Sequence, residues 1–244
     1  MDLQRALEDQ ARAWDRRPLL RQVYAEWYGV ILDRLSPVPG RSIELGSGIG
    51  KLRDYAGARV ELTDIEKTRW VDDEVNATAL PYGSGTLANI VMLDVFHHIP
   101  DPARFLDEAA RTLTAGGRVV MIEPYCSPLS TPFYKYLHHE RTDVKAEPFA
   151  ADRAISAPME SNQARPTLIF YRHRSEYQQR WPTLAVREQR RFSFLLYPLS
   201  GGFSRRPLVS VRLSAPLQVL ERGLRPLAPL LAFRCLVVLE RQGG

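Results

Sequence analysis

The sequence predicts an α/β fold in which a mainly parallel sheet is covered by helices on both faces. Between residues 41 and 126, short apolar segments of strand length alternate with segments of helical periodicity, which is typical of parallel strands joined by helices. The first apolar segment also runs directly into a turn with three glycines, Gly46, Gly48 and Gly50. Such a turn after the first strand is a common ligand site in sheets of this kind.

The chain before the first strand predicts two helices. Residues 2–16 carry apolar side chains among charged ones at helical spacing, and a second helix opens at Pro18 and stops at a Ser-Pro-Val-Pro-Gly segment. The second helix contains Tyr24, Trp27 and Tyr28. These aromatic side chains either make ordinary helix contacts or cover a cleft.

The first two strands frame the glycine turn. The first covers residues 42–45, and a helix is expected from about Lys51. Glycine permits positive φ and close approach of a ligand, and the N–H groups that begin a helix are free to bind it. The second strand, residues 60–64, ends at Asp64. An acid there binds ribose hydroxyls in doubly wound sheets, and a helix-capping acid is the structural alternative.

Two more strands and a helix complete this half of the chain. The segments 89–94 and 118–124 are apolar and of strand length, and the clearest helix covers residues 101–113. Asp101 suits the N-cap and Pro102 suits the first helical position.

This series of motifs resembles the class I S-adenosylmethionine-dependent methyltransferases, within them the branch of ubiquinone- and menaquinone-biosynthesis enzymes (methyltransferase type 11). The five motifs that carry the resemblance, in the family's order, are Glu-Leu-Gly-Ser-Gly-Ile-Gly at 44–50, Asp64, Asn-Ala-Thr-Ala-Leu-Pro-Tyr at 76–82, His-His-Ile-Pro-Asp at 97–101 and Arg-Thr-Leu-Thr-Ala-Gly-Gly at 111–117. Asn76 replaces the usual Asp, and Thr114-Ala115 replaces Lys-Pro. The connection from Asp64 to Asn76 is too short for a full helix.

The resemblance implies S-adenosylmethionine as methyl donor and S-adenosylhomocysteine as product. By motif position, Glu44 would attract the ammonium end, Asp64 would bind both ribose hydroxyls, and Asn76 would bind the adenine amino group through its amide oxygen. His97 and His98 lie either beside the cofactor or in a structural turn. The cofactor-binding residues implied are Glu44, Gly46, Ser47, Gly48, Gly50, Asp64, Ile65, Asn76, Ala77, Asp94 and His98.

The resemblance also implies a Rossmann-like, doubly wound, mainly parallel seven-stranded sheet with an antiparallel closing strand. One domain over residues 1–244 would comprise N-terminal helices (1–40), a cofactor-binding core (41–126), an insertion or lid on the acceptor side (127–190), and C-terminal strands with a helix (191–244). Further strands are expected at 168–171, 192–197 and 233–240. Leucines from 217 to 231 predict a helix that Pro226 ends or kinks, and it either packs on the sheet or lies on a membrane.

The insertion contains the residues expected to act on the acceptor. His138 or His139, with Glu140 beside them, would serve as a general base or a polar anchor. Alignment alone can also drive methyl transfer, so a base need not exist. These three residues are too few for a clear zinc site, and the two widely spaced cysteines, Cys126 and Cys235, predict reduced thiols. We therefore expect no metal.

Composition and charge bound the function. The 244 residues are 45% apolar, contain no apolar run long enough to span a bilayer and begin without a signal-peptide core, which predicts a cytoplasmic protein. The formal net charge is −4 over residues 1–150 and +9 over 151–244, where all the cations are arginine. That basic half either contacts an anionic membrane, at its inner surface, or is a solvated face. No Asn/Asp-Pro-Pro-Tyr motif follows the strand at 89–94, which disfavours the exocyclic-amine chemistry of DNA adenine methyltransferases. No nucleic-acid partner is expected.

The function predicted is methyl transfer by SN2 displacement to an unidentified small-molecule or amphiphilic acceptor, a lipid or a saccharide. One alternative is a non-catalytic binding module with the same fold. A nicotinamide-binding oxidoreductase is a weaker one, because Lys51 stands where Gly-x-Gly-x-x-Gly requires glycine.

Overall fold

A single mixed sheet organises the computed structural model, which describes residues 3–138 and 140–243. Its strands are β1 (Arg41–Leu45), β2 (Glu61–Asp64), β3 (Asp73–Glu74), β4 (Leu87–Leu93), β5 (Leu113–Pro124), β6 (Leu184–Phe192) and β7 (Arg234–Arg241). They lie in the order β3-β2-β1-β4-β5-β7-β6. Strands β1 to β5 pair in parallel, and β7 runs antiparallel to both β5 and β6. The expected seven-stranded, mainly parallel sheet with an antiparallel closing strand is confirmed.

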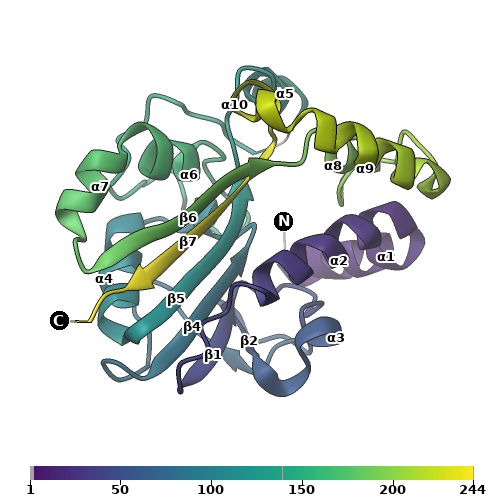
Figure 1. Cartoon of the computed structure of the whole chain (residues 1–244). Coiled ribbons are helices and arrows are strands. Elements are labelled where there is room, and N and C mark those ends of the chain that lie inside the picture. Colours follow the sequence, from purple (N-terminus) through teal and green to yellow (C-terminus); the bar gives the residue numbers. More distant parts are fainter. Residues whose placement is uncertain (1–2, 139, 244) are drawn as a thin grey trace.

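Helices cover both faces of this sheet (Figure 1). They are α1 (Leu3–Arg16), α2 (Pro18–Leu32), α3 (Arg53–Ala56), α4 (Pro102–Thr112), α5 (Ser130–Leu137), α6 (Arg165–Thr167), α7 (Arg174–Arg180), α8 (Leu196–Ser200), α9 (Ser214–Gly223) and α10 (Ala228–Leu231). The described residues also form the short helical turns η1 (Gly57–Arg59), η2 (Phe96–His98), η3 (Leu168–Arg172), η4 (Val211–Leu213) and η5 (Arg225–Leu227). Nowhere in the described part of the chain is a helix both long and apolar enough to cross a membrane.

The two faces follow from the alternation of side chains along each strand. In β4, Ile90 and Met92 pack into the core on the α4 side, whereas Val91 and Leu93 pack into the core beneath α1 and α2. Because the central strands are buried on both faces, they have continuous apolar sequences. This is why the strands at 89–94 and 118–124 could be recognised from the sequence.

Local signals predicted several element ends well. Asp101 caps α4, since its Oδ1 accepts a hydrogen bond of 3.0 Å from Arg104 N. The closing strand lies within one residue of its expected position. No helix separates β2 from β3. The helix expected from Lys51 is shorter than predicted: residues after the glycine turn form turns, and α3 is a single turn from Arg53.

Two expected strands are wrong. Residues 168–171 lie in η3, a turn of π-helix, in which His173 N donates to Leu168 O. A short buried apolar run does not distinguish a strand from a buried helical turn. Residues 192–197 end β6 and enter α8, with Ser193 in a left-handed conformation at φ 60°. The true sixth strand, residues 184–192, is rich in arginine because it is an edge strand with β7 as its neighbour.

The insertion at 127–190 is held by a buried arginine. Arg165 is 1% exposed. Its guanidinium donates to the carbonyl oxygens of Pro148 at 3.1 Å and Ala150 at 2.9 Å, and pairs with Asp152 at 3.1 Å. These contacts fix the irregular segment between α5 and α6, which forms one side of the cleft described below.

The leucine-rich C-terminal segment is broken as its prolines predict. Helix α9 ends at Gly223, and η5 and α10 follow it. Leu217, Leu224 and Leu231 are half-buried against the two cores, whereas Leu220 and Leu227 are exposed. The helix therefore packs by one side only.

Candidate functional site

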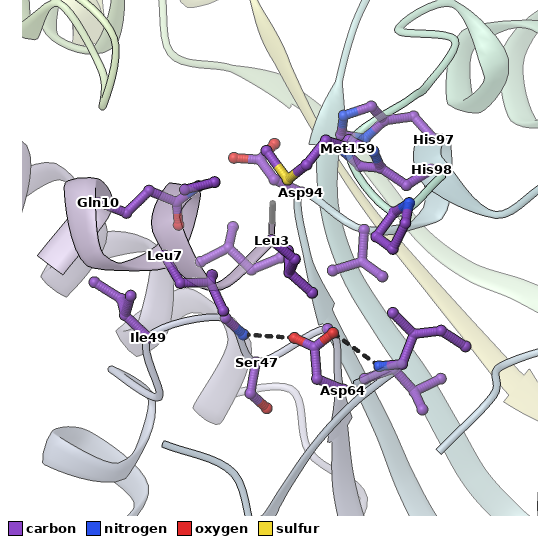
Figure 2. Close-up of a pocket in the computed structure, with 18 of the residues that line it drawn as sticks. Leu3, Leu7, Gln10, Ser47, Ile49, Asp64, Asp94, His97, His98 and Met159 are labelled. Carbon is purple, nitrogen blue, oxygen red and sulfur yellow. Dashed lines mark hydrogen bonds between the residues drawn. The ribbon is translucent and has the colours of Figure 1, made fainter. Parts of the chain in front are cut away.

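A cleft of about 690 Å³ lies at the carboxyl ends of β1, β2 and β4. This is where the strand order reverses between β1 and β4, the usual ligand position in doubly wound sheets. Figure 2 shows Leu3, Leu7 and Gln10 of α1 on one side of the cleft and His97 and His98 on the other. Its volume is in the range of small-ligand and cofactor sites.

The three glycines of the turn after β1 all have positive φ, but they serve different needs. A Cβ at Gly46 would lie 2.5 Å from Val95 Cγ2, and one at Gly50 would lie 2.7 Å from Trp70 O. These two positions require glycine for the protein's own packing. At Gly48 a Cβ would meet nothing closer than Leu7, at 3.7 Å. The backbone at Gly48 is thus the part of the turn that faces open space under α1.

Asp64 ends β2 directly opposite this turn. Its Oδ2 accepts from Gly48 N at 2.9 Å and its Oδ1 from Ile65 N at 2.8 Å (Figure 2). Each carboxylate oxygen keeps further acceptor capacity, because it can accept two hydrogen bonds. Burial raises the pKa of Asp64 above its ordinary value, while the backbone N–H donors oppose that shift. Asp64 lines the cleft and does not cap a helix.

Glu44 is the buried acid at the end of β1. It is 3% exposed, and its Oε2 has no hydrogen-bond partner among residues 3–138 and 140–243. Burial raises its pKa to about 7, against a hydrogen bond from Ser47 that lowers it, and the charge of Asp64 adds to the rise. A buried carboxylate oxygen without a partner is costly. A cationic ligand group in the cleft would satisfy it.

The part of the cleft that was expected to bind adenine lies at the turn after β3. Ala77 and Asn76 line the cleft, and Ile65 exposes 40% of its surface beside them. Asn76 Oδ1 already accepts from Thr78 N at 2.9 Å and from Thr78 Oγ1 at 2.8 Å. The amide N–H groups of Asn76 are therefore its more available atoms, in contrast to the expected use of its oxygen.

Asp94 follows β4 with a left-handed backbone, φ 59°. It forms a salt bridge of 2.6 Å with Arg234 and accepts from Tyr24 Oη at 3.3 Å. The Arg234 guanidinium lies over the rings of Tyr197 at 4.2 Å and Trp27 at 5.3 Å. Arg234 was missed from the sequence, because it lies on the closing strand, 140 positions from Asp94, and carries no local motif.

His97 is buried between two carboxylates. Its Nδ1 lies 2.6 Å from Glu123 Oε2, and its Nε2 lies 3.3 Å from Glu140 Oε2. Glu123 is itself held at the end of β5 by the N–H groups of Val95 and Phe96. Burial alone lowers the pKa of His97, but the two carboxylates outweigh it and raise that pKa to about 10. The sequence indicated His97 only as one of two readings and did not single out Glu123.

His98 and Glu140 complete this group. His98 Nδ1 lies 2.9 Å from the carbonyl oxygen of Glu160, and its Nε2 lies 3.9 Å from Glu140 Oε2. Burial, with the neighbouring His97 charge, lowers the pKa of His98 to about 4. The Glu140 carboxylate accepts from Ser161 Oγ at 2.6 Å and from Gln163 Nε2. Although burial opposes it, the charge of His97 holds the pKa of Glu140 well below its usual range.

The predicted acceptor residues are placed only in part. His138 lines the cleft, and its Nδ1 accepts from Glu140 N at 3.3 Å. His139 lies outside the described residues. The insertion contributes polar and apolar residues to the cleft in equal measure: His138, Glu140, Ser156 and Gln163, and Ile155, Ala157, Pro158 and Met159. Other segments add the apolar side chains of Leu3, Ile99, Pro100 and Phe203.

Comparison with known proteins gives the family. The model of the methyltransferase domain matches residues 19–193, well over half of the chain. The chain belongs to this methyltransferase domain family. The match confirms the expected class I S-adenosylmethionine-dependent methyltransferase, and it includes the glycine turn, Asp64 and the His97-His98 motif.

A curated relative agrees with the branch that the motifs indicated. It is a demethylmenaquinone methyltransferase of Renibacterium salmoninarum, 26% identical, in a match that covers 54% of this chain and 60% of that protein. The match thus spans less than two thirds of the relative's length.

Solved structures share the fold at low sequence identity. A methyltransferase of Haloferax volcanii, from a complex with a methyltransferase activator, has a TM-score of 0.53 at 17% identity and covers 97% of this chain and 98% of its own. A geranyl diphosphate methyltransferase in complex with S-adenosylmethionine has a TM-score of 0.52 at 16% identity, covering 95% and 90%. An S-adenosylmethionine-dependent methyltransferase of Mesorhizobium loti has a TM-score of 0.51 at 16% identity, and the match covers 89% of this chain and 98% of that one.

Proposed function

We propose that the cleft binds S-adenosylmethionine and that the chain transfers its methyl group to a small acceptor with an apolar body. The observation that carries this proposal is the pair of acids at the glycine turn. Glu44 has a buried oxygen with no hydrogen-bond partner among the described residues, and Asp64 is fixed by Gly48 and Ile65 with acceptor capacity to spare. An ammonium group and a pair of ribose hydroxyls match these two acids in charge and in hydrogen bonding.

The other cleft residues fit the remaining parts of such a ligand. The open backbone at Gly48 suits the flat nucleoside, and Gly46, Ser47 and Gly50 shape the turn beneath it. Ile65 offers an apolar surface to the adenine, while Ala77 N–H and the Asn76 amide offer hydrogen bonds to its edge. Asp94 and His98 lie at the β4 side of the cleft, where the methionine end would meet the acceptor.

The chemistry needs little from the protein beyond alignment. S-adenosylmethionine, when bound, supplies an electrophilic methyl group on a sulfonium centre. The cleft residues would position the acceptor against the methyl group, and such positioning alone can supply a large part of the rate enhancement. His138, on the insertion side, is the proposed polar anchor or base for an acceptor hydroxyl. His139 remains its alternative.

The acceptor class that we favour follows from apolar side chains that line the cleft. Leu3, Met159 and Phe203 contribute apolar area from three separate segments. An acceptor with a hydrocarbon or aromatic body would bury that area, whereas a free sugar would leave it in contact with polar groups. We therefore favour an amphiphilic or aromatic small molecule.

Ligand-dependent thermal stability tests the proposal against its alternatives. A ligand that binds only the folded state raises the melting temperature. S-adenosylhomocysteine should raise it and NAD should not. A rise with NAD alone would indicate an oxidoreductase. A rise with S-adenosylhomocysteine but no methyl transfer to any acceptor in a panel of quinols, phenols and prenyl compounds would favour a binding module.

A second proposal concerns the surface beside the cleft. Exposed apolar side chains lie along the segment from 208 to 230, with Leu208 75% and Val219 64% exposed. Arginines interleave with them at 205, 206, 212, 222 and 225. An apolar surface flanked by cations matches an anionic lipid bilayer. Because Phe203 and Ser204, a few residues before this segment, line the cleft, we propose that the segment docks on such a bilayer, which vesicle sedimentation tests.

A further inference from the structure

We propose that His97, His98 and Glu140 bind a divalent transition-metal ion at the acceptor side of the cleft. Each of the three residues offers one ligand atom, and these atoms all lie within 4.8 Å of one another. The ring contacts below assign the two histidine ligands to Nε2. The expectation of no metal rested on His138, His139 and Glu140 as neighbours in sequence. The fold instead brings Glu140 to His97 and His98, about 40 positions earlier.

The orientation of both rings supports the site. A histidine that binds a metal nearly always gives its other ring nitrogen to a carboxylate or a backbone carbonyl. Both histidines do this here: His97 Nδ1 faces the buried Glu123 carboxylate at 2.6 Å, and His98 Nδ1 faces the Glu160 carbonyl at 2.9 Å. Two independent partners therefore turn both Nε2 atoms toward Glu140.

The distances also suit an ion. Ligand atoms at about 2.1 Å from one tetrahedral Zn²⁺ lie roughly 3.4 Å apart. Glu140 Oε2 lies 3.3 Å from His97 Nε2 and 3.9 Å from His98 Nε2. The ion would take the place of the proton between His97 and Glu140, and Ser161 and Gln163 would stay as hydrogen-bond donors to the liganding carboxylate. Such outer donors are usual for metal-binding carboxylates.

The donor set indicates the class of ion and its use. Two imidazoles and one carboxylate favour Zn²⁺, Fe²⁺, Co²⁺ or Mn²⁺ over Ca²⁺ or Mg²⁺, which prefer oxygen. Three protein ligands leave a coordination position open, as in catalytic metal sites. Because all three residues line the cleft, that position would take an oxygen of the acceptor and lower its pKa. This last step rests on the proposed methyl transfer, whereas metal binding does not.

The experiment is a titration of chelator-treated full-length protein with Co²⁺, followed by visible absorption, and with Zn²⁺, followed by calorimetry. We expect one site per chain. His98→Ala and Glu140→Gln should each weaken binding by roughly 100-fold or more, because losing even an outer hydrogen-bond partner of a metal ligand costs roughly 10- to 100-fold. His173→Ala is the matched control, because His173 pairs with Glu176 on α7, outside this cleft, and it should bind like the wild type.

The outcomes separate this site from the proposed function. Equal affinity in all three variants would show an adventitious ion only, and absence of saturable binding to the wild type would leave His97 as an imidazolium held by two carboxylates. Both results overturn the site. Asp64→Ala should keep full metal affinity, so a failure of S-adenosylhomocysteine binding and a failure of metal binding are seen independently. Circular dichroism of each variant confirms that it is folded.

Discussion

Glu44 is a buried acid whose charge changes near neutral pH. Its folded-state pKa is about 7, above the ordinary 4.5. Because the pKa of Glu44 is higher in the folded state than in the unfolded state, ionisation of Glu44 destabilises the fold. The protein therefore loses stability as the pH rises from 4.5 to about 7. An ammonium group bound beside Glu44 offsets this cost, so ligand binding and deprotonation favour each other.

S-adenosylhomocysteine should therefore bind more tightly as the pH rises from about 5.5 to about 8, since the carboxylate form of Glu44 increases over that window. In Glu44→Gln the affinity should be lower and nearly independent of pH. Calorimetry across this range measures both. Glu74→Gln, an exposed acid on β3, is the control that should keep the wild-type profile. A flat profile for the wild type would remove Glu44 from ligand binding.

Asp64 makes a second prediction at this scale. Asp64→Ala should weaken S-adenosylhomocysteine binding by about 1.5–3 kcal/mol, the scale of hydrogen bonds to a charged group. Asp73→Ala, which removes an exposed carboxylate from the adjacent strand, should leave the affinity unchanged. Equal affinity of a folded Asp64→Ala protein and the wild type, by calorimetry, would exclude the ribose role.

The sequence predicted residues whose partners are local and missed those whose partners are distant. Glu44, the glycines and Asp64 lie within one unit from β1 through α3 to β2, so their proximity could be inferred. Glu123 and Arg234 act on His97 and Asp94 across 26 and 140 positions. Only the pairing of β4, β5 and β7 brings them together, and no local pattern encodes that pairing.

At the scale of elements, the glycine turn can be tested for packing. Gly46→Ala would place a Cβ 2.5 Å from Val95 in a left-handed backbone. Gly85→Ala would also place alanine in a left-handed backbone, at φ 66°, but its Cβ would have no described neighbour within 4 Å. The second change should cost about 1–2 kcal/mol from the backbone alone, and the first about 1–3 kcal/mol more from overpacking. Urea denaturation measures the loss of unfolding free energy in each variant. Equal losses would show that Val95 moves aside without strain.

Among the elements, burial decides which ones a sequence reveals. The central strands β4 and β5 are largely apolar and were recognised, whereas β6 lies at the sheet edge and carries three arginines among mostly half-buried side chains. The π-turn at 168–172 is as apolar as a strand because the insertion packs it inward. Hydrophobicity reports burial in both cases, and it reports the backbone conformation only where a periodicity extends over several turns.

At the scale of the whole molecule, the uneven charge makes a prediction for membrane contact. The protein should sediment with vesicles containing phosphatidylglycerol, and less in about 0.5 M salt, where the screening length is only a few ångströms. Arg222→Ala should weaken this association about fivefold, in line with about 1 kcal/mol per basic residue near an anionic surface.

Arg59→Ala is the matched control, because Arg59 lies in η1, directly after α3, and does not belong to the segment from 208 to 230. It should sediment like the wild type. If the protein sediments equally with phosphatidylcholine and phosphatidylglycerol vesicles, or if Arg222→Ala and Arg59→Ala weaken sedimentation equally, the arginines are solvated charges without a membrane role.

The place of β7 between β5 and β6 has a consequence for biosynthesis. Translation delivers β6 before β7, yet β6 finds its partner in the sheet only through β7. While residues 184–233 leave the ribosome, β5 therefore has an unpaired edge and β6 has no place in the sheet. Arg234, the partner of Asp94, arrives with that same last strand. A nascent chain stopped before residue 234 should remain sensitive to protease, and release of β7 closes the sheet and completes the cleft in one event.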